Sequence, residues 1–445
     1  RFGESLAQEV AYEALLLRER RQLHERIGFL LEDTRDEADA ERDALLAHHF
    51  ARSDNREKAI AALLRAAHRA ETLPSYTAAV HLFRQAWELA DASLAGDGAG
   101  TDERLRRWVV EAALGLARAV VLYGPSHLAD AERAARRGRE LAEALGDVQS
   151  HAGLCLFLGM IMMSGERDKF AEGLALAEEG LVIAQRANLA LQTVSLSRGL
   201  AWGYLNDGQF ALAQRTITWV MAELEQHGHR EQLSDIYFGA RWIRDGVRFH
   251  SDDLEGALAG ATETHALALA AGNRTSRSGA ASNLAQVSLE RGDYPQALHW
   301  AEQSLEIAQA IGSVAGIRTA AAVAMVARSE LGESGFAAHY VELIEEGLAA
   351  GGTLPLNSRV VVDAFLAIGD LKRARRITDL AYARGGGRLR EAIIASALGD
   401  VMLRLGAAHW SDAERWYTQA IALAQTLGAR STEAVTLLGT AELAA

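Results

Sequence analysis

The chain has 445 residues, with 46 lysines and arginines, 59 aspartates and glutamates and a single cysteine. Its formal net charge of −13 argues against nucleic acid as a partner, because binding a phosphate backbone needs a basic surface. One cysteine excludes an internal disulfide or thiolate metal cluster, and no apolar run approaches the roughly 20 residues that span a bilayer. We therefore expect a cytoplasmic protein that makes no membrane contact.

Helix is the element predicted along almost the whole chain. Alanine, leucine, glutamate and arginine dominate, and the four prolines all fall where a helix would begin. The length exceeds the roughly 250 to 300 residues at which one core stops growing, which favours several domains or a linear array. The predicted helices are 5–33 (broken near Leu17), 37–53, 56–71, 75–93, 101–123, 126–146, 148–164, 169–187, 189–205, 209–227, 230–250, 253–272, 275–291, 294–312, 314–331, 335–350, 356–368, 371–384, 388–405, 410–427 and 431–443.

One spacing recurs along these helices about every 40 residues. A large apolar residue is followed by a small one at +3, a further residue at +7 and usually another small one at +10. These offsets share one helical face, and the small residues let a neighbouring helix approach closely. One predicted unit is degenerate, with Phe336 in the large position and His339 at +3. The clear sets are Tyr76/Ala79/Phe83/Ala86, Leu128/Ala131/Ala135/Gly138, Phe170/Gly173/Ala177/Gly180, Phe210/Ala213/Ile217/Val220, Leu254/Ala257/Ala261/Thr264, Tyr294/Ala297/Ala301/Ser304, Leu371/Ala374/Thr378/Ala381 and Trp410/Ala413/Tyr417/Ala420.

Each set marks the second helix of a predicted antiparallel pair. Short breaks such as Arg291-Gly292-Asp293 and Ile368-Gly369-Asp370 supply a left-handed glycine and a helix cap between the two helices. The spacing from Ser282 to Ile307 matches the tetratricopeptide unit of about 34 residues. The sequence therefore predicts an all-α, tetratricopeptide-like solenoid, a right-handed superhelix of antiparallel helix pairs.

The opening of the chain resembles a known family. Gln8-Glu9-Val10-Ala11-Tyr12-Glu13-Ala14-Leu15-Leu16 and Leu23-His24-Glu25-Arg26-Ile27, followed by Leu46-Ala47-His48-His49-Phe50, are similar to a segment of bacterial STAND-type signalling ATPases fused to adenylate or guanylate cyclases. Related ATPases attached to protein kinases or to LuxR-type DNA-binding domains share this segment. The resemblance covers about the first ninety residues. It implies that 1–33 is the helical end of a winged-helix or connector region, and that 34–445 is a repeat array controlling an ATPase and output domains outside this chain.

Residues for catalysis, metal binding or cofactor binding are not evident. The triplet Gly385-Gly386-Gly387 lacks the following lysine and preceding strand of a phosphate-binding loop. His24-Glu25 lacks a second histidine at zinc-protease spacing, and His48-His49 places two rings about 100° apart on a helix. We expect no enzyme activity, no metal and no cofactor.

Two stripes on predicted first helices are candidate binding residues. Arginine beside aromatic residues is typical of surfaces that bind acidic peptides, and first helices line the concave face of such a solenoid. Alternatively, the aromatic residues are core and the arginines pair with acids across the stack. The two stripes are Arg198, Trp202 and Asn206, and Tyr237, Arg241, Arg244 and Arg248.

The leading hypothesis is a protein-interaction or sensor arm that binds a protein or peptide, or a second copy of itself, in an extended concave groove. A second hypothesis is a small-molecule sensor like the arm of LuxR-type activators, which a pocket closed by Trp202, Trp242 and Tyr237 would favour. A third is a purely structural spacer.

Overall fold

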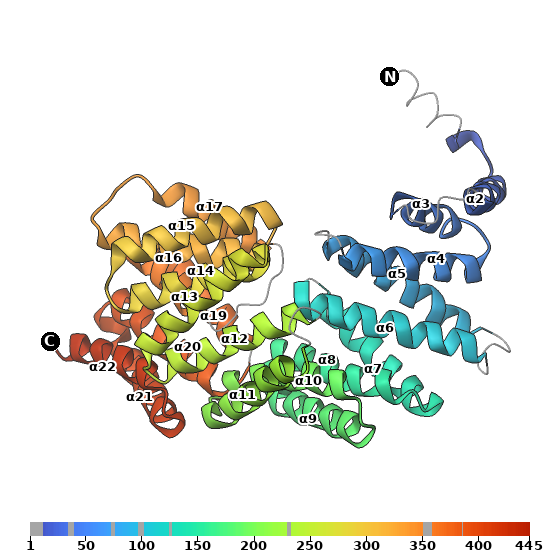
Figure 1. The fold of residues 1–445 in the computed structure, drawn as a ribbon. Coiled ribbons are helices and arrows are strands. Elements are labelled where there is room, and N and C mark those ends of the chain that lie inside the picture. Colours follow the sequence, from blue (N-terminus) through green and yellow to red (C-terminus); the bar gives the residue numbers. More distant parts are fainter. Residues whose placement is uncertain are drawn as a thin grey trace. The chain divides into compact units, whose positions relative to one another are not determined.

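The computed structural model describes residues 12–33, 40–72, 76–96, 102–123, 127–228, 233–349, 358–384 and 386–445. Within these ranges the regular elements are all helices, which confirms the predicted all-α class (Figure 1). The predicted break near Leu17 is where α2 begins. Gly385 and the segment before Tyr12 lie outside the described residues.

The helices are α2 Leu17–Asp33, α3 Ala40–Phe50, α4 Arg56–Thr72, α5 Tyr76–Leu94, α6 Glu103–Tyr123, α7 Leu128–Leu145, α8 Val148–Ser164, η2 Arg167–Lys169, α9 Phe170–Arg186, α10 Ala190–Asn206, α11 Phe210–Gln226, α12 Ser234–His250, α13 Leu254–Ala270, α14 Arg274–Glu290, α15 Tyr294–Ile311, α16 Val314–Glu330, α17 Ala337–Ala349, α18 Ser358–Ala367, α19 Leu371–Ala383, α20 Arg388–Leu405, η3 Ala407–His409, α21 Trp410–Leu427 and α22 Arg430–Ala444.

Consecutive helices pack as pairs, and the pairs stack. Most helices contact the next one along the chain, as α14 contacts α15 and α20 contacts α21. The even-numbered helices also contact one another, as in α10 with α12, α12 with α14 and α18 with α20. This is the tetratricopeptide-like solenoid that the spacing predicts, with the even-numbered helices as the first helices of the pairs.

The small residues of the recurring spacing lie at the helix contacts. Ala213, Ala257 and Ala297 are at most 1% exposed. At Gly173 a methyl group would lie 2.6 Å from the carbonyl oxygen of Gly159, because α9 and α8 approach there backbone to backbone. Larger side chains at these positions would force the helices apart, since such a core has no spare volume.

The degenerate unit has a different register from the predicted one. We expected Phe336 to be its large residue and His339 to lie at the helix contact, but His339 is exposed. The buried residues of α17 are Tyr340, Ile344 and Gly347. They lie at +3, +7 and +10 from Ala337, so the unit keeps the usual offsets with the small and large residues exchanged. That exchange hid the register from the sequence pattern.

The turns use the predicted residues. Gly292 has a φ of +72°, and the Asp293 carboxylate accepts a hydrogen bond from the Gln296 amide at the start of α15. Asp370 caps α19 in the same way, through the Arg373 amide. Each break therefore ends one helix and starts the next within a few residues.

The described chain divides into two compact units. The first takes the residues up to Tyr123 and His127–Phe157, and the second takes Leu158–Ala445, so the boundary falls within α8. The predicted division at residue 33 stays a prediction. Among the described residues, no helix combines the length and apolar character needed to cross a bilayer.

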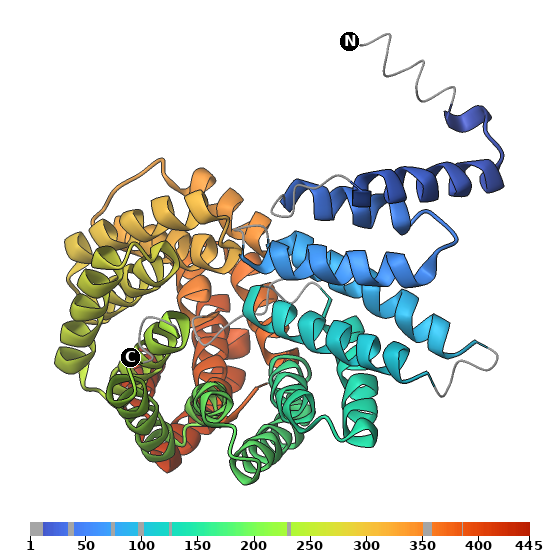
Figure 2. The same cartoon turned by 45° about the vertical axis from the view of Figure 1, so that its right-hand side comes forward.

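The second unit turns back on itself. Its later helix α20 packs against α10, and α22 packs against α12. Figure 2 shows these orange-to-red helices beside the green and yellow ones that begin the unit. Along the first helices where we expected an extended concave groove, α20 therefore lies against α10 and α22 against α12.

Candidate binding site inside the second unit

A cavity of about 140 Å³ lies between the two sets of first helices in the second unit. We call it the chamber. Residues of α10, α12 and α14 line one side of it, and residues of α18, α20 and α22 line the other. The turn of the solenoid back on itself therefore creates a site that no single repeat contains. Its lining includes Leu205, Trp242, Asp245, Phe249, His250, Val287, Glu290, Arg359, Val360, Asp363, Ile393, Ser396 and Val435.

Arg359 is the centre of the polar wall of the chamber. Its Nε donates to both oxygens of Asp363, at 2.8 and 3.0 Å, one helical turn away on α18. Its Nη1 donates to Ser396 Oγ at 2.9 Å, and its Nη2 donates to Asp400. A guanidinium can satisfy several acceptors in its plane at once, so Arg359 joins α18 to α20.

Carboxylates outnumber the guanidinium at this wall. Burial, together with the carboxylates of Asp400 and Glu290, raises the pKa of Asp363 to about 6, although Arg359 opposes the rise. Tyr417 Oη donates to Asp400 at 2.7 Å, and Ser431 Oγ donates to Glu290 at 2.9 Å. The wall is therefore a negatively charged, hydrogen-bonded surface.

Most of the remaining lining is apolar or aromatic. Trp242 and Phe249 of α12, Val287 of α14 and Ile393 of α20 all line the chamber. His250 also lies there, and burial lowers its pKa to about 4, so its imidazole is neutral at neutral pH. An apolar lining with a few convergent polar groups is the usual composition of a ligand pocket.

Four of the seven predicted binding residues lie on α12. Tyr237 and Arg241 are each 2% exposed. Arg241 Nε donates to Thr264 Oγ1 at 2.9 Å, and its Nη2 pairs with Glu263 at 2.5 Å. These bonds connect α12 to α13 inside one helix pair, whereas the alternative interpretation placed such pairs across the stack.

Arg244 and Arg248 are largely neutralised by acids. Arg244 Nε donates to Asp245 Oδ1 at 2.9 Å, and Arg248 Nη1 lies 3.8 Å from the same oxygen. Arg248 also donates to the carbonyl oxygen of Gly256 at 3.0 Å. Asp245 itself is 2% exposed, and burial raises its pKa.

The predicted stripe on α10 is also largely internal. Asn206 is buried and donates to the carbonyl oxygen of Trp202 at 2.8 Å. The half-buried Arg198 packs beside Gly239 of α12, and burial lowers its pKa. None of the seven predicted residues lines the chamber, which takes Leu205, Trp242 and Asp245 from the same two helices instead. A binding role for the seven residues stays a prediction.

Sequence reasoning missed the chamber residues Arg359 and Asp363. A usable signal was present, because two opposite charges four residues apart flank the apolar run Val360-Val361-Val362. Charges within so apolar a short helix favour an internal ion pair. The sequence did not show that α18 lies close to α14 in space, which brings Glu290 to the same wall.

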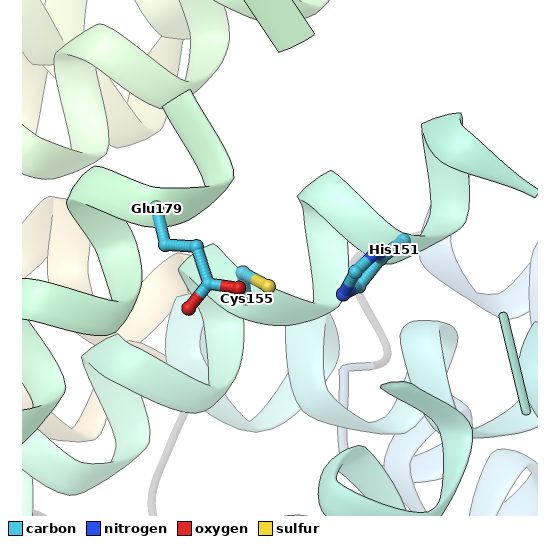
Figure 3. A group of neighbouring side chains, drawn as sticks. All are labelled: His151, Cys155 and Glu179. Carbon is cyan, nitrogen blue, oxygen red and sulfur yellow. The ribbon is translucent and has the colours of Figure 1, made fainter. Parts of the chain in front are cut away.

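The single cysteine lies on α8 in the first unit. Cys155 is buried and follows His151 by one helical turn (Figure 3). A thiol and an imidazole are two ligands, and structural zinc sites use four. Glu179, also drawn there, belongs to α9 and to the second unit, and we assign no metal site to these residues.

Comparisons with known proteins support the fold. No protein-family model matches the sequence, and no curated protein does. A Rap protein complexed with Competence and Sporulation Factor is similar at a TM-score of 0.56 and 14% identity, covering 83% of this chain and 98% of that one. The Rap conjugation gene regulator of plasmid pLS20, in complex with the Phr* peptide, is similar at 0.53 and 12%, covering 83% and 95%. The STAND protein PH0952 of Pyrococcus horikoshii, with a tetratricopeptide repeat sensor, has a TM-score of 0.42 at 15% identity, covering 97% of this chain and 61% of that one. At these identities the first two likenesses establish a shared fold alone.

Proposed function

We propose that the chain is a binding arm whose second unit takes up a segment of a partner protein or peptide, and that it acts by recognition rather than turnover. The observation that supports this most is the chamber, whose largely apolar lining also holds the Arg359 network. Side chains from six helices converge there. A merely structural spacer gains nothing from a hollow, charged interior, because buried charges weaken a core more often than they strengthen it.

The charge of the chamber selects the ligand. Asp363 interacts with one guanidinium, Arg359, and with two further carboxylates, Asp400 and Glu290. A cationic group entering the chamber would offset that excess of negative charge, while its aliphatic stem would contact Trp242 and Val287. The proposed ligand is therefore a lysine or arginine side chain or a terminal ammonium group, in contrast to the acidic peptides that the arginine stripes suggested.

The fold neighbours are consistent with this proposal. Two solved structures that share the fold are complexes, one with Competence and Sporulation Factor and one with the Phr* peptide. They give a precedent for ligand binding by this architecture, and the chamber gives the reason to expect it here.

Peptide selection tests the proposal. Two immobilised libraries of N-terminally acetylated hexapeptides, one with lysine fixed at a central position and one with norleucine there, are probed with the purified chain. We expect retention on the lysine library only. Selected peptides should bind Asp363→Asn about tenfold more weakly, because one charge-assisted hydrogen bond is lost. Asp379→Asn is the matched control, since Asp379 forms the same four-residue ion pair with Arg375 on an exposed face. Equal retention on both libraries, or unaltered binding by Asp363→Asn, would count against the chamber.

The narrower proposal is that this binding regulates a STAND-type ATPase and an output domain such as a cyclase. It rests on the resemblance of the first ninety residues. The coding sequence upstream of Arg1 tests it: a phosphate-binding loop would support the ATPase, and an unrelated upstream protein would exclude it.

A small-molecule sensor is the second candidate, because a chamber of about 140 Å³ is small for a peptide. Trp242 lines it, whereas Trp202 and Tyr237 do not. Calorimetric titration with n-butylamine distinguishes the two. Binding as tight as that of a selected peptide would favour the small molecule.

A further inference from the structure

A second cavity, of about 330 Å³, lies where the late helices of the second unit meet the early ones. We call it the seam pocket. Its lining comes from η2 and the start of α9, from Asp207 at the end of α10, from the end of α19 and from the start of α20. It is separate from the chamber, because the two linings share no residue.

Arg390 lies on the wall of the seam pocket and has an unusual environment. It is only 5% exposed, and its Nε and Nη2 make no hydrogen bond in the described part of the chain. The charges that act on it are those of Arg318 and Arg384, which are cationic like itself. Burial, with the help of these two arginines, lowers the pKa of Arg390 to about 10, so the guanidinium still carries its charge at neutral pH. A buried charge without a counterion is costly, and native proteins rarely keep one without a purpose.

The other charges of the pocket balance. Arg388 Nη2 pairs with Asp207 Oδ2 at 2.8 Å, and Arg167 pairs with Glu391. Both pairs link the start of α20 to residues before it in the unit. Asp168, the remaining acid of the lining, is exposed, and in the described part of the chain no acid accepts a hydrogen bond from the Nε or Nη2 of Arg390. The lining thus holds three arginines and three acids, and its buried, unmatched positive charge is that of Arg390.

The backbone at this point also favours an anion. Helix α20 starts in the pocket, and Gly387 at its N-cap supplies no capping side chain. The first amides of a helix lack partners within it and carry a partial positive charge. The first of them here, the Arg388 amide, already donates to Asp207 Oδ1 at 3.2 Å, so an added anion would use the amides that follow it. Gly386 and Gly387 have φ values of +113° and +92°, which bring the chain into the pocket without side chains to fill it. The same glycines, read from the sequence, lacked the lysine of a phosphate-binding loop; in the fold, the arginine three residues after Gly387 occupies the wall.

We propose that the seam pocket binds an oxyanion, the phosphate or carboxylate group of a small ligand, against the guanidinium of Arg390 and the start of α20. Phosphate and carboxylate oxygens match the planar donors of a guanidinium. Because its walls come from α9 and α10 on one side and from α19 and α20 on the other, a bound oxyanion also holds the second unit in its closed form. This goes beyond the proposed function, since it assigns a second ligand of opposite charge to a different site.

Thermal unfolding of the full chain tests the proposal. Inorganic phosphate, acetate and chloride are added at equal ionic strength in an amine buffer. We expect phosphate or acetate, but not chloride, to raise the unfolding temperature in a saturable way, and the effective anion identifies the ligand group. Calorimetry with the effective anion then gives its dissociation constant.

Two variants and a control locate the effect. Arg390→Met should lose the anion response and be no less stable than the wild type without anion, because an unpaired buried charge has been removed. Arg390→Lys keeps the charge but not the fork of donors, and should bind the anion at least about tenfold more weakly. Arg404→Met, at the exposed far end of the same helix, should respond like the wild type. A response to chloride equal to that of the oxyanions, or one that survives in Arg390→Met, would overturn the proposal. So would full-strength binding by Arg390→Lys if the methionine variant did not fold.

Discussion

Replacing Gly387 with alanine tests the closure of the second unit. Gly387 has φ +92° and ψ 154°, a conformation essentially restricted to glycine, which costs other residues about 1–3 kcal/mol. A methyl group on it would lie 2.4 Å from the carbonyl oxygen of Asn206 in α10, which is backbone and cannot rotate away. Relieving that contact costs about 1–3 kcal/mol more, as in other overpacked sites.

Gly406→Ala is the matched control. Gly406 lies at the other end of α20 with φ +99° and ψ −177°, so its backbone carries a similar penalty. A methyl group on Gly406 would have no neighbouring atom within 4 Å, so the contact penalty is absent. The difference between Gly387→Ala and Gly406→Ala therefore isolates the contact with α10.

Native-state hydrogen exchange is the appropriate assay, because a chain of two units need not unfold in one step. Gly387→Ala should lower the opening free energy of amides in α10 and in the first turns of α20 by about 1–3 kcal/mol more than Gly406→Ala does. Equal loss of protection in the two variants would show that the stability of α20 does not depend on its contact with α10. The packing of α20 against α10, which closes the chamber, would then be contradicted.

Three further predictions concern charged groups. The His68 imidazole donates hydrogen bonds to the carboxylates of Glu111 and Glu71, and these bonds raise its pKa to about 9. The stabilisation that His68 gives is therefore complete below pH 6.5 and lost as the pH rises through 9; NMR titration of the imidazole measures this, and a midpoint near 6.5 would contradict it. Arg359→Met leaves buried carboxylates uncompensated and should lower the opening free energy of amides in α18 and α20, measured by native-state hydrogen exchange, by about 3–5 kcal/mol. The exposed Arg375→Met should lower that of α19 by about 1 kcal/mol or less, and similar losses in the two variants would place Arg359 outside a buried network. Burial raises the pKa of Asp363 to about 6, so its contribution to stability is complete below pH 3.8 and is lost as the pH rises through 6. Asp363→Asn should therefore remove the loss of stability between pH 3.8 and 6. A variant with the same dependence of stability on pH as the wild type would argue against the raised pKa.

The sequence by itself determined the repeating architecture. Alternation of large and small residues at fixed offsets is a local property, and Ala213, Ala257 and Ala297 are buried as that pattern requires. Caps such as Asp293 and Asp370 are equally local. In α17 the small residue, Ala337, comes before the large one, Tyr340, which reverses the usual order, and there the same pattern predicted the wrong register.

Only the tertiary structure decided which residues could form a site. The direction of an arginine on a first helix depends on what packs beside it, and for Arg241 that is Glu263 of its own helix pair. Glu290 of α14 shares a wall with Arg359 of α18, and Arg390 lines the seam pocket, because the solenoid curves until its late helices return to its early ones. That curvature is the sum of small rotations at every helix contact, and such a sum is not carried by any local stretch of sequence.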